Sequence, residues 1–196
     1  MRIGALLVIV ACVVVALATS GAHPLTSSAT DALTAFGEVT TRRQLDLHLG
    51  PDTFEHVAEV ARDPSADFGM RLRAIGALPL FCVPRPCAGT PPHLVARDLL
   101  ARDPVSTDGR QVLRVRAAVE AIGLMRSGAL DDAAAVSSLL NDPSRDVRAA
   151  AAHALANLCD TTALPALRAR YTSEQVDQVR VAISNALRTF DTCVGP

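Results

Sequence analysis

Apolar residues recur at the same spacing in three segments of the chain, each opened by an apolar residue followed by an arginine. Counted from its opening residue, each segment has apolar side chains at positions 0, 4, 7, 8 and 11. The three sets are Val147, Ala151, Ala154, Leu155 and Leu158; Met70, Ala74, Ala77, Leu78 and Phe81; and Val179, Ile183, Ala186, Leu187 and Phe190. At about 100° per residue these positions fall on one narrow helix face, so each segment is predicted to be an amphipathic helix.

A fourth and poorer copy lies at 113–125, where the small and large positions slip relative to the other three. The last two good copies start at Val147 and Val179, and this step corresponds to the length of one helical hairpin. Asp63-Pro64, Asp103-Pro104 and Asp142-Pro143 supply turns inside the hairpins, because proline blocks the continuation of a helix. Thr90-Pro91-Pro92 is predicted to cap and start a helix that reaches about Arg102.

The repeats predict an all-α fold, an α-solenoid of antiparallel helical hairpins. Four hairpins are expected, near residues 51–80, 90–125, 129–158 and 162–190, after a degenerate helix pair near 28–49 that serves as an N-terminal cap. Alternating β-branched runs, the signature of strands, are missing outside the first residues of the chain. A solenoid displays an extended surface, so binding is the mode of action that this architecture favours.

The repeat resembles the HEAT repeat family, in the short bacterial form related to the phycobilin-lyase repeats. The motifs that carry the resemblance are Asp142-Pro143, Val147-Arg148, Ala151-Ala152, Ala154-Leu155 and the segment 163–167. The resemblance covers roughly residues 51–190 and is best over 129–190. It implies a superhelix whose second helices line a concave surface for protein contact, and it implies no activity.

Residues 1–22 have the pattern of a signal peptide. Arg2 precedes an uncharged apolar run, and Ser20-Gly21-Ala22 offers small residues for cleavage before residue 23. The predicted organisation is therefore a signal peptide at 1–22, capping helices at 23–50 and a repeat domain at 51–192. Two alternatives remain open: an uncleaved membrane anchor, or a lipoprotein modified at Cys12. In each case the repeat domain lies outside the cytoplasm, in the periplasm or secreted.

Four cysteines remain after Cys12 is set aside, an even number that suits an oxidising compartment. Cys82 and Cys159 occupy the same repeat position two repeats apart, so the distance between them should be about twice the ~8–10 Å spacing of packed helices. A disulfide needs Cα atoms within roughly 7 Å, which excludes this pairing. Of the two pairings that remain, we prefer Cys82 with Cys87, which closes a short loop, and Cys159 with Cys193, which ties the ends of consecutive second helices. A zinc site or a redox pair is the alternative, but no second close Cys or His pair completes a tetrahedral set.

Composition and motifs exclude several classes of function. The net charge is −1, which gives no electrostatic basis for binding nucleic acid, and aromatic residues make up only 3%, too few for base stacking. The chain contains no metalloprotease motif, nucleophile elbow, phosphate loop or dinucleotide fingerprint. The histidines have no metal-ligand spacing, and the pair Asp131-Asp132 is explained by a helix start. No catalytic residue, metal site or cofactor is predicted.

Arginines early in each second helix allow two interpretations. In the first, Arg73, Arg116, Arg148 and Arg180 form a ladder with the turn residues Asp63, Asp103, Asp142 and Asp177. In the second, an arginine-lined strip binds an acidic segment of a partner. The family resemblance favours the ladder for Arg148 and Arg180. The residues then predicted to contact a partner are Arg73, Arg116, His153, Asn157, Asn185 and Arg188.

Two functional hypotheses follow. The first is a non-catalytic exported scaffold or adaptor, monomeric, that binds a protein or peptide on its concave second-helix face. The second, which rests on the resemblance, is a lyase or tetrapyrrole chaperone of the phycobilin-lyase type. The absence of an obvious nucleophile or acid pair in the sequence favours the first.

Overall fold

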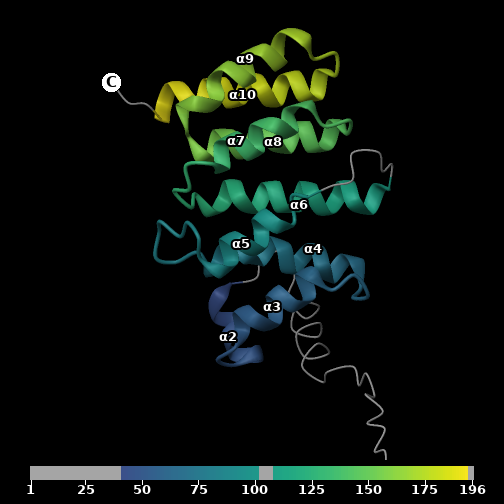
Figure 1. Ribbon diagram of the computed structural model, residues 1–196, viewed down its shortest axis with the longest axis vertical. Coiled ribbons are helices and arrows are strands. Elements are labelled where there is room, and N and C mark those ends of the chain that lie inside the picture. The colour runs from purple at the N-terminus through teal and green to yellow at the C-terminus, as the bar shows by residue number, and fades with distance from the viewer. Residues whose placement is uncertain (1–40, 102–107, 194–196) are drawn as a thin grey trace, which may run out of the picture.

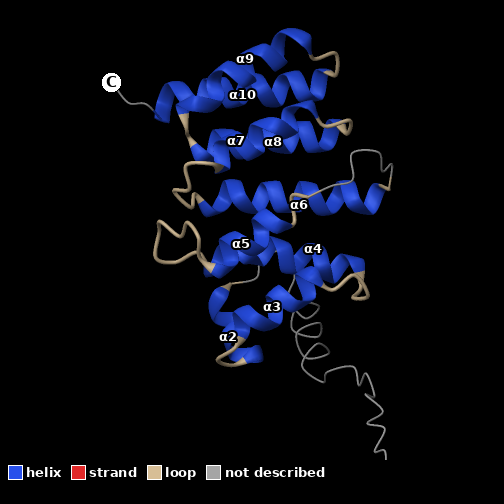
Figure 2. Ribbon diagram, in the orientation of Figure 1, coloured by secondary structure: helices blue, strands red, loops and turns tan. Residues whose placement is uncertain are grey.

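The chain folds as an all-α solenoid, with its helices stacked in a column (Figure 1). The computed structural model describes residues 41–101 and 108–193, and within these ranges every regular element is a helix (Figure 2). This confirms the fold class that the repeat pattern predicts.

Each hairpin consists of a first helix and a longer or equally long second helix. The first helices are α3 (Thr53–Arg62), α5 (Pro91–Asp98), α7 (Asp132–Ser138) and α9 (Leu164–Ser173). The second helices are α4 (Phe68–Ala77), α6 (Gly109–Met125), α8 (Arg145–Leu158) and α10 (Asp177–Cys193). Short 3₁₀ turns at Leu78–Phe81, Leu139–Asn141 and Thr161–Ala163 extend or join these helices, and α2 (Arg42–Leu49) precedes the first hairpin. All four predicted hairpins are present.

The second helices carry most of the packing between repeats. Helix α4 contacts α6, α6 contacts α8, and α8 contacts α10, while each first helix packs on the second helix of its own hairpin. The shared positions of the repeat supply these contacts. Val147, Ala151, Ala154 and Leu155 of α8 are buried, as are Val179, Ile183 and Ala186 of α10. The apolar stripe read from the sequence is therefore the core of the stack.

Helix α6 follows the same pattern in a different register from the one predicted. Leu113, the expected first position, is exposed, whereas Val115, Val119, Ile122 and Gly123 are buried at positions 0, 4, 7 and 8. The match at 113–125 is poor because this copy of the repeat starts at Val115 and not at Leu113. With Val115 as its start, the copy precedes Val147 by the same step that separates Val147 from Val179.

Helix α5 is shorter than predicted and is not capped as predicted. It ends at Asp98 rather than near Arg102, which lies outside the described residues. Thr90 precedes the helix, but its hydroxyl donates to the carbonyl of Cys87 at 2.7 Å and caps no helix N–H. The reason is local, because the loop before α5 turns back on itself and presents that carbonyl to the threonine.

The structure pairs the four described cysteines as expected. Cys82 is joined to Cys87, with Cα atoms 5.4 Å apart, and Cys159 is joined to Cys193 at a Cα distance of 6.1 Å. The first pair closes the proline-rich loop that follows α4. The second ties the end of α8 to the end of α10, so that neighbouring second helices are linked covalently.

The predicted signal peptide, Cys12 and most of the predicted cap lie outside the described residues. Among the described helices, none combines the length and the apolar character needed to cross a membrane.

Two repeats approach each other closely at Gly123 of α6. A methyl group at this position would lie 2.7 Å from the Cα of Ala154 and 2.9 Å from its Cβ. Such distances leave no room for any side chain, so the glycine lets the backbones of α6 and α8 pack directly against each other.

Replacing Gly123 with alanine should destabilise the protein by about 1–3 kcal/mol, because the clash is with backbone and α6 and α8 must separate. Gly76→Ala is the matched control, since a methyl group there meets nothing within 4 Å, and alanine in a helix should stabilise by about 0.5–1 kcal/mol. Urea unfolding of the two variants tests this. Equal stability of both variants would show that the close approach does not exist.

A second prediction concerns the cysteines. Intact-mass measurement after thiol labelling of the unfolded, unreduced protein should find no label on Cys82, Cys87, Cys159 or Cys193. Label on any of these four would contradict the pairing, whereas label on Cys12 would not bear on it.

Candidate functional site

A groove runs between two second helices, α4 and α6. Its volume is about 330 Å³, and its lining residues are Leu72, Gly76, Leu113, Arg116, Ala117, Glu120, Ala121 and Leu124. Small residues form part of its surface on both helices, which keeps the groove open between the larger side chains.

Two leucines in this groove are exposed because they lie off the buried stripe of α6. Leu113 has 41% of its surface exposed and Leu124 has 54%. Since the stripe begins at Val115, residues 113 and 124 fall on the flank of the helix that neither α5 nor α8 covers. Exposed leucines gathered in a groove are a feature of binding surfaces rather than of a sealed core.

An ion pair lies in the same groove. Arg116 Nε donates to Glu120 Oε1 at 2.8 Å, one turn further along α6, and this bond raises the pKa of the arginine. Both side chains are about half exposed. An exposed pair of this kind contributes little stability, so either partner can exchange it for a ligand group at low cost.

The two helices that form the groove carry more arginines than carboxylates, although Arg116 is the one arginine that lines it. Helices α4 and α6 together carry five arginines, Arg71, Arg73, Arg110, Arg114 and Arg116, and one carboxylate, Glu120. Arg114 is used structurally, since it donates to the carbonyls of Leu99 and Ala101 at 2.9 and 2.7 Å. Burial lowers the pKa of Arg114, and the nearby charge of Arg71 lowers it further.

The predicted contact residues are spread over more than one surface. Arg73 is exposed on α4 and His153 on α8, while Asn157 and Asn185 are half-buried. Of the six, Arg116 lines the groove between α4 and α6. Arg188 lines a different groove, between α9 and α10, and donates to Asn185 of its own helix.

Arg148 forms a ladder contact of the predicted kind, with a different carboxylate from the one predicted. Arg148 is buried; its Nη1 donates to the carbonyls of Asp142 and Pro143, at 2.9 and 3.0 Å. Its carboxylate partner is Glu174 of the next hairpin, reached at 2.8 and 3.1 Å, rather than Asp142. The guanidinium therefore bridges its own turn and the next hairpin.

The ladder prediction is wrong for Arg180. This residue is exposed, and its guanidinium lies over the ring of Tyr171, 5.4 Å from the ring centre. Arg180 occupies the same repeat position as Arg148, but within the described residues no further hairpin follows it to supply a carboxylate.

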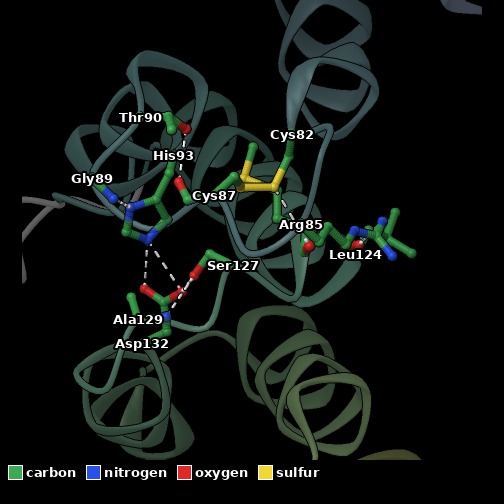
Figure 3. The surroundings of a disulfide bond; sticks show 11 residues. Cys82, Arg85, Cys87, Gly89, Thr90, His93, Leu124, Ser127, Ala129 and Asp132 are labelled. Carbon is green, nitrogen blue, oxygen red and sulfur yellow. Dashed lines mark hydrogen bonds and ion pairs between the residues drawn. A yellow bond between two sulfur atoms is a disulfide. The ribbon is translucent and has the colours of Figure 1, made fainter.

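A buried polar network lies at the hairpin loops, beside the Cys82–Cys87 disulfide (Figure 3). His93 Nδ1 accepts from the N–H of Gly89, so its proton is on Nε2, which donates to the carboxylate of Asp132 at 2.9 Å. Ser127 Oγ donates to the same carboxylate, and Arg97 Nη1 donates to it at 3.0 Å. His93, Ser127 and Asp132 are all buried.

This network is a structural link and not a catalytic triad. The carboxylate stands between the serine and the histidine, so the imidazole does not contact the serine hydroxyl, and both nitrogens of the imidazole are engaged. Its members come from α5, the loop after α6 and α7, so it fixes consecutive hairpins at their loop ends. Sequence reasoning missed it, because His93 and Asp132 are 39 residues apart and nothing in their spacing brings them together.

The described residues contain no group of three or more His, Cys, Asp or Glu side chains arranged to hold a metal ion. The groove leucines were also missed in the sequence. The exposed positions 113 and 124 could have been found only from the correct register of α6.

Comparison with known protein families identifies one match. The model for HEAT repeats matches residues 103–188, which covers α6 to most of α10. Searches among curated proteins and among solved structures gave no match.

The pair between Arg148 and Glu174 predicts a dependence of stability on pH. The pKa of Glu174 is lowered from 4.5 to about 2, chiefly by its hydrogen bond to Arg148, against the opposing effect of burial. A carboxyl group whose pKa is lower in the folded than in the unfolded protein stabilises the fold at pH values above its unfolded pKa. This stabilisation is lost as the pH falls towards the folded pKa. The free energy of unfolding should therefore decrease between pH 4.5 and about 2, and it should decrease less in Glu174→Gln.

Substituting Arg148 with methionine should lower the free energy of unfolding by about 2–4 kcal/mol at pH 7. The reason is that the charge of the buried Glu174 would then be compensated by Arg170 without Arg148. Arg145→Met on the exposed side of the same helix should change stability by less than about 0.5 kcal/mol. Urea unfolding measures both, and similar losses in the two variants would contradict the buried pair.

Proposed function

Residues 103–188 of this chain belong to the HEAT repeat family, and we propose that the protein is an exported, non-catalytic scaffold that binds a protein or peptide through the second-helix face. The single observation that carries this proposal is the groove between α4 and α6, where leucines are exposed beside Arg116. Helical repeats of this kind commonly present such surfaces to other proteins.

The chemistry of the groove favours a peptide segment with apolar and acidic side chains. Leu72, Leu113 and Leu124 can bury apolar side chains, and at about 330 Å³ the groove holds a few side chains rather than a whole domain. The arginine excess on α4 and α6 attracts carboxylates. Arg116 can pair with a ligand carboxylate in place of Glu120, in a bidentate geometry that arginine suits.

Two features support an extracytoplasmic location. Residues 1–22 have the pattern of a signal peptide, and the two cysteine pairs at disulfide distance suit an oxidising compartment. Retention of the leader as an anchor and lipidation of Cys12 are alternative routes to the same side of the membrane.

No observation on the described residues favours a lyase or tetrapyrrole chaperone over a scaffold, since the one Ser–His–Asp cluster among them is a structural link.

A peptide-display library panned on the purified protein tests the proposal. Peptides with apolar and acidic residues should be enriched. Leu124→Ser should weaken their binding about tenfold, because the burial of the leucine side chain against the peptide, which contributes roughly 1–2 kcal/mol, is lost. Arg116→Ala should weaken binding and reduce its dependence on salt.

The matched control is Leu130→Ser. Leu130 is 94% exposed but lies in the loop after α6, away from the groove. The proposal fails if no enriched peptide depends on Leu124, or if Leu130→Ser weakens binding as much as Leu124→Ser does.

A further inference from the structure

The groove between α4 and α6 is lined by small residues between larger apolar side chains. On α6, Ala117 and Ala121 lie between Leu113 and Leu124, and Gly76 lines the groove from α4. A methyl group added to Gly76 would meet nothing within 4 Å, so the space above its backbone is open. A surface of small residues also lets α6 and α8 pack closely on each other, and here it leaves room for the close approach of another helix.

Hydrogen bonding in this groove favours a helical occupant over an extended one. Within a helix the backbone N–H and C=O groups bond to each other, so the interior of α6 offers a ligand no backbone partner. Among the residues that line the groove, only Arg116 and Glu120 have polar side chains. An extended segment lying on the other residues would leave buried backbone groups unpaired, whereas a helix pairs its own.

The length of the groove along α6 corresponds to about three helical turns. Leu113 and Leu124 both line it, and the eleven residues from one to the other span roughly 16 Å at about 1.5 Å per residue. A partner helix of this length reaches both leucines with apolar side chains spaced three and four residues apart. Its apolar stripe then covers the small residues between them.

Arginines lie on both sides of this surface. Arg116 lines the groove on α6, and Arg73, exposed on α4, is three residues from Gly76 and therefore lies beside the groove. Apart from Glu120, neither helix carries a carboxylate. The charge of the two helices therefore complements a partner that carries carboxylates on both sides of its apolar stripe.

We propose, building on the proposed function of the same groove, that the partner binds there as an amphipathic α-helix of about three turns with carboxylates flanking its apolar stripe. One carboxylate takes the place of Glu120 on Arg116, and Glu120, about half exposed, is then solvated by water. A carboxylate on the other flank faces Arg73.

Two display libraries of equal composition, panned on the purified full-length protein, test the conformation of the partner. Both hold peptides of about fourteen residues with four fixed leucines, and the other positions vary among alanine, glutamine, glutamate and lysine. In the first library the leucines are three and four residues apart, as on a helix face, and in the second they alternate, as on a strand. Binders that depend on Leu124 should come from the first library, with glutamate enriched over lysine beside the leucines. A proline in the middle of such a peptide should weaken binding about a hundredfold, because it breaks the helix.

Protein variants test the contact surface with the same peptides. Gly76→Gln should weaken binding at least tenfold, because its side chain fills the open space in the groove, and it should not lower the melting temperature. Gly109→Gln is the matched control, since this helical glycine also has open space around it but does not line the groove. In Arg73→Gln and in Arg116→Gln, replacing the glutamate on the corresponding flank of the peptide with glutamine should no longer weaken binding.

Four outcomes would overturn the helical partner. If Leu124-dependent binders come from the alternating library and tolerate a central proline, the groove binds an extended segment, and the proposed function stands. Enrichment of lysine over glutamate, or unchanged binding to Gly76→Gln, would contradict the charge pattern or the contact surface. A wild-type protein that sediments as a dimer, and as a monomer once Leu124→Ser is introduced, would show that a second copy occupies the groove. If neither library yields a binder that depends on Leu124, the proposed function fails together with the helical partner.

Discussion

Second helix packs directly on second helix, and this contact sets the arrangement of everything else in the fold. At Gly123 the backbone of α6 lies against Ala154 of α8, too close for any side chain. This approach is possible because the repeat places alanine or glycine on the facing side of the helices, and it aligns α4, α6, α8 and α10 in one layer. The stability of the stack therefore lies in many short apolar contacts between neighbours, as in other repeat proteins.

The same packing determines which surfaces are left for binding. Each second helix uses one side for the preceding repeat and another for the following one, so only the remaining flank reaches solvent. On α6 that flank carries Leu113, Arg116 and Leu124, which line the groove against α4.

Polar and covalent links hold the hairpins at their loop ends, where the apolar stripe does not reach. The Cys82–Cys87 loop packs against the loop after α6, since Cys87 and Ala88 donate to the carbonyl of Ser127 at 2.9 and 3.0 Å. Ser127 in turn contacts Asp132, which His93 and Arg97 also bind (Figure 3). Further along, Cys159–Cys193 and Arg148–Glu174 link the last two hairpins. These links resist sliding between repeats, which non-directional apolar packing alone permits.

Local periodicity, together with positions shared between repeats, was enough to establish the helical hairpins, the buried stripe and the cysteine pairs. Val147 and Val179 mark the stripe whether or not the fold is known. Four features emerged only once the hairpins were packed: the register of α6, the partner of Arg148, the network of His93 with Asp132, and the separation of Arg116 and Arg188 into two grooves. Each of these depends on how far one hairpin is turned relative to the next, and that angle is set by the shapes of packed residues such as Gly123 and Ala154, not by their spacing along the chain.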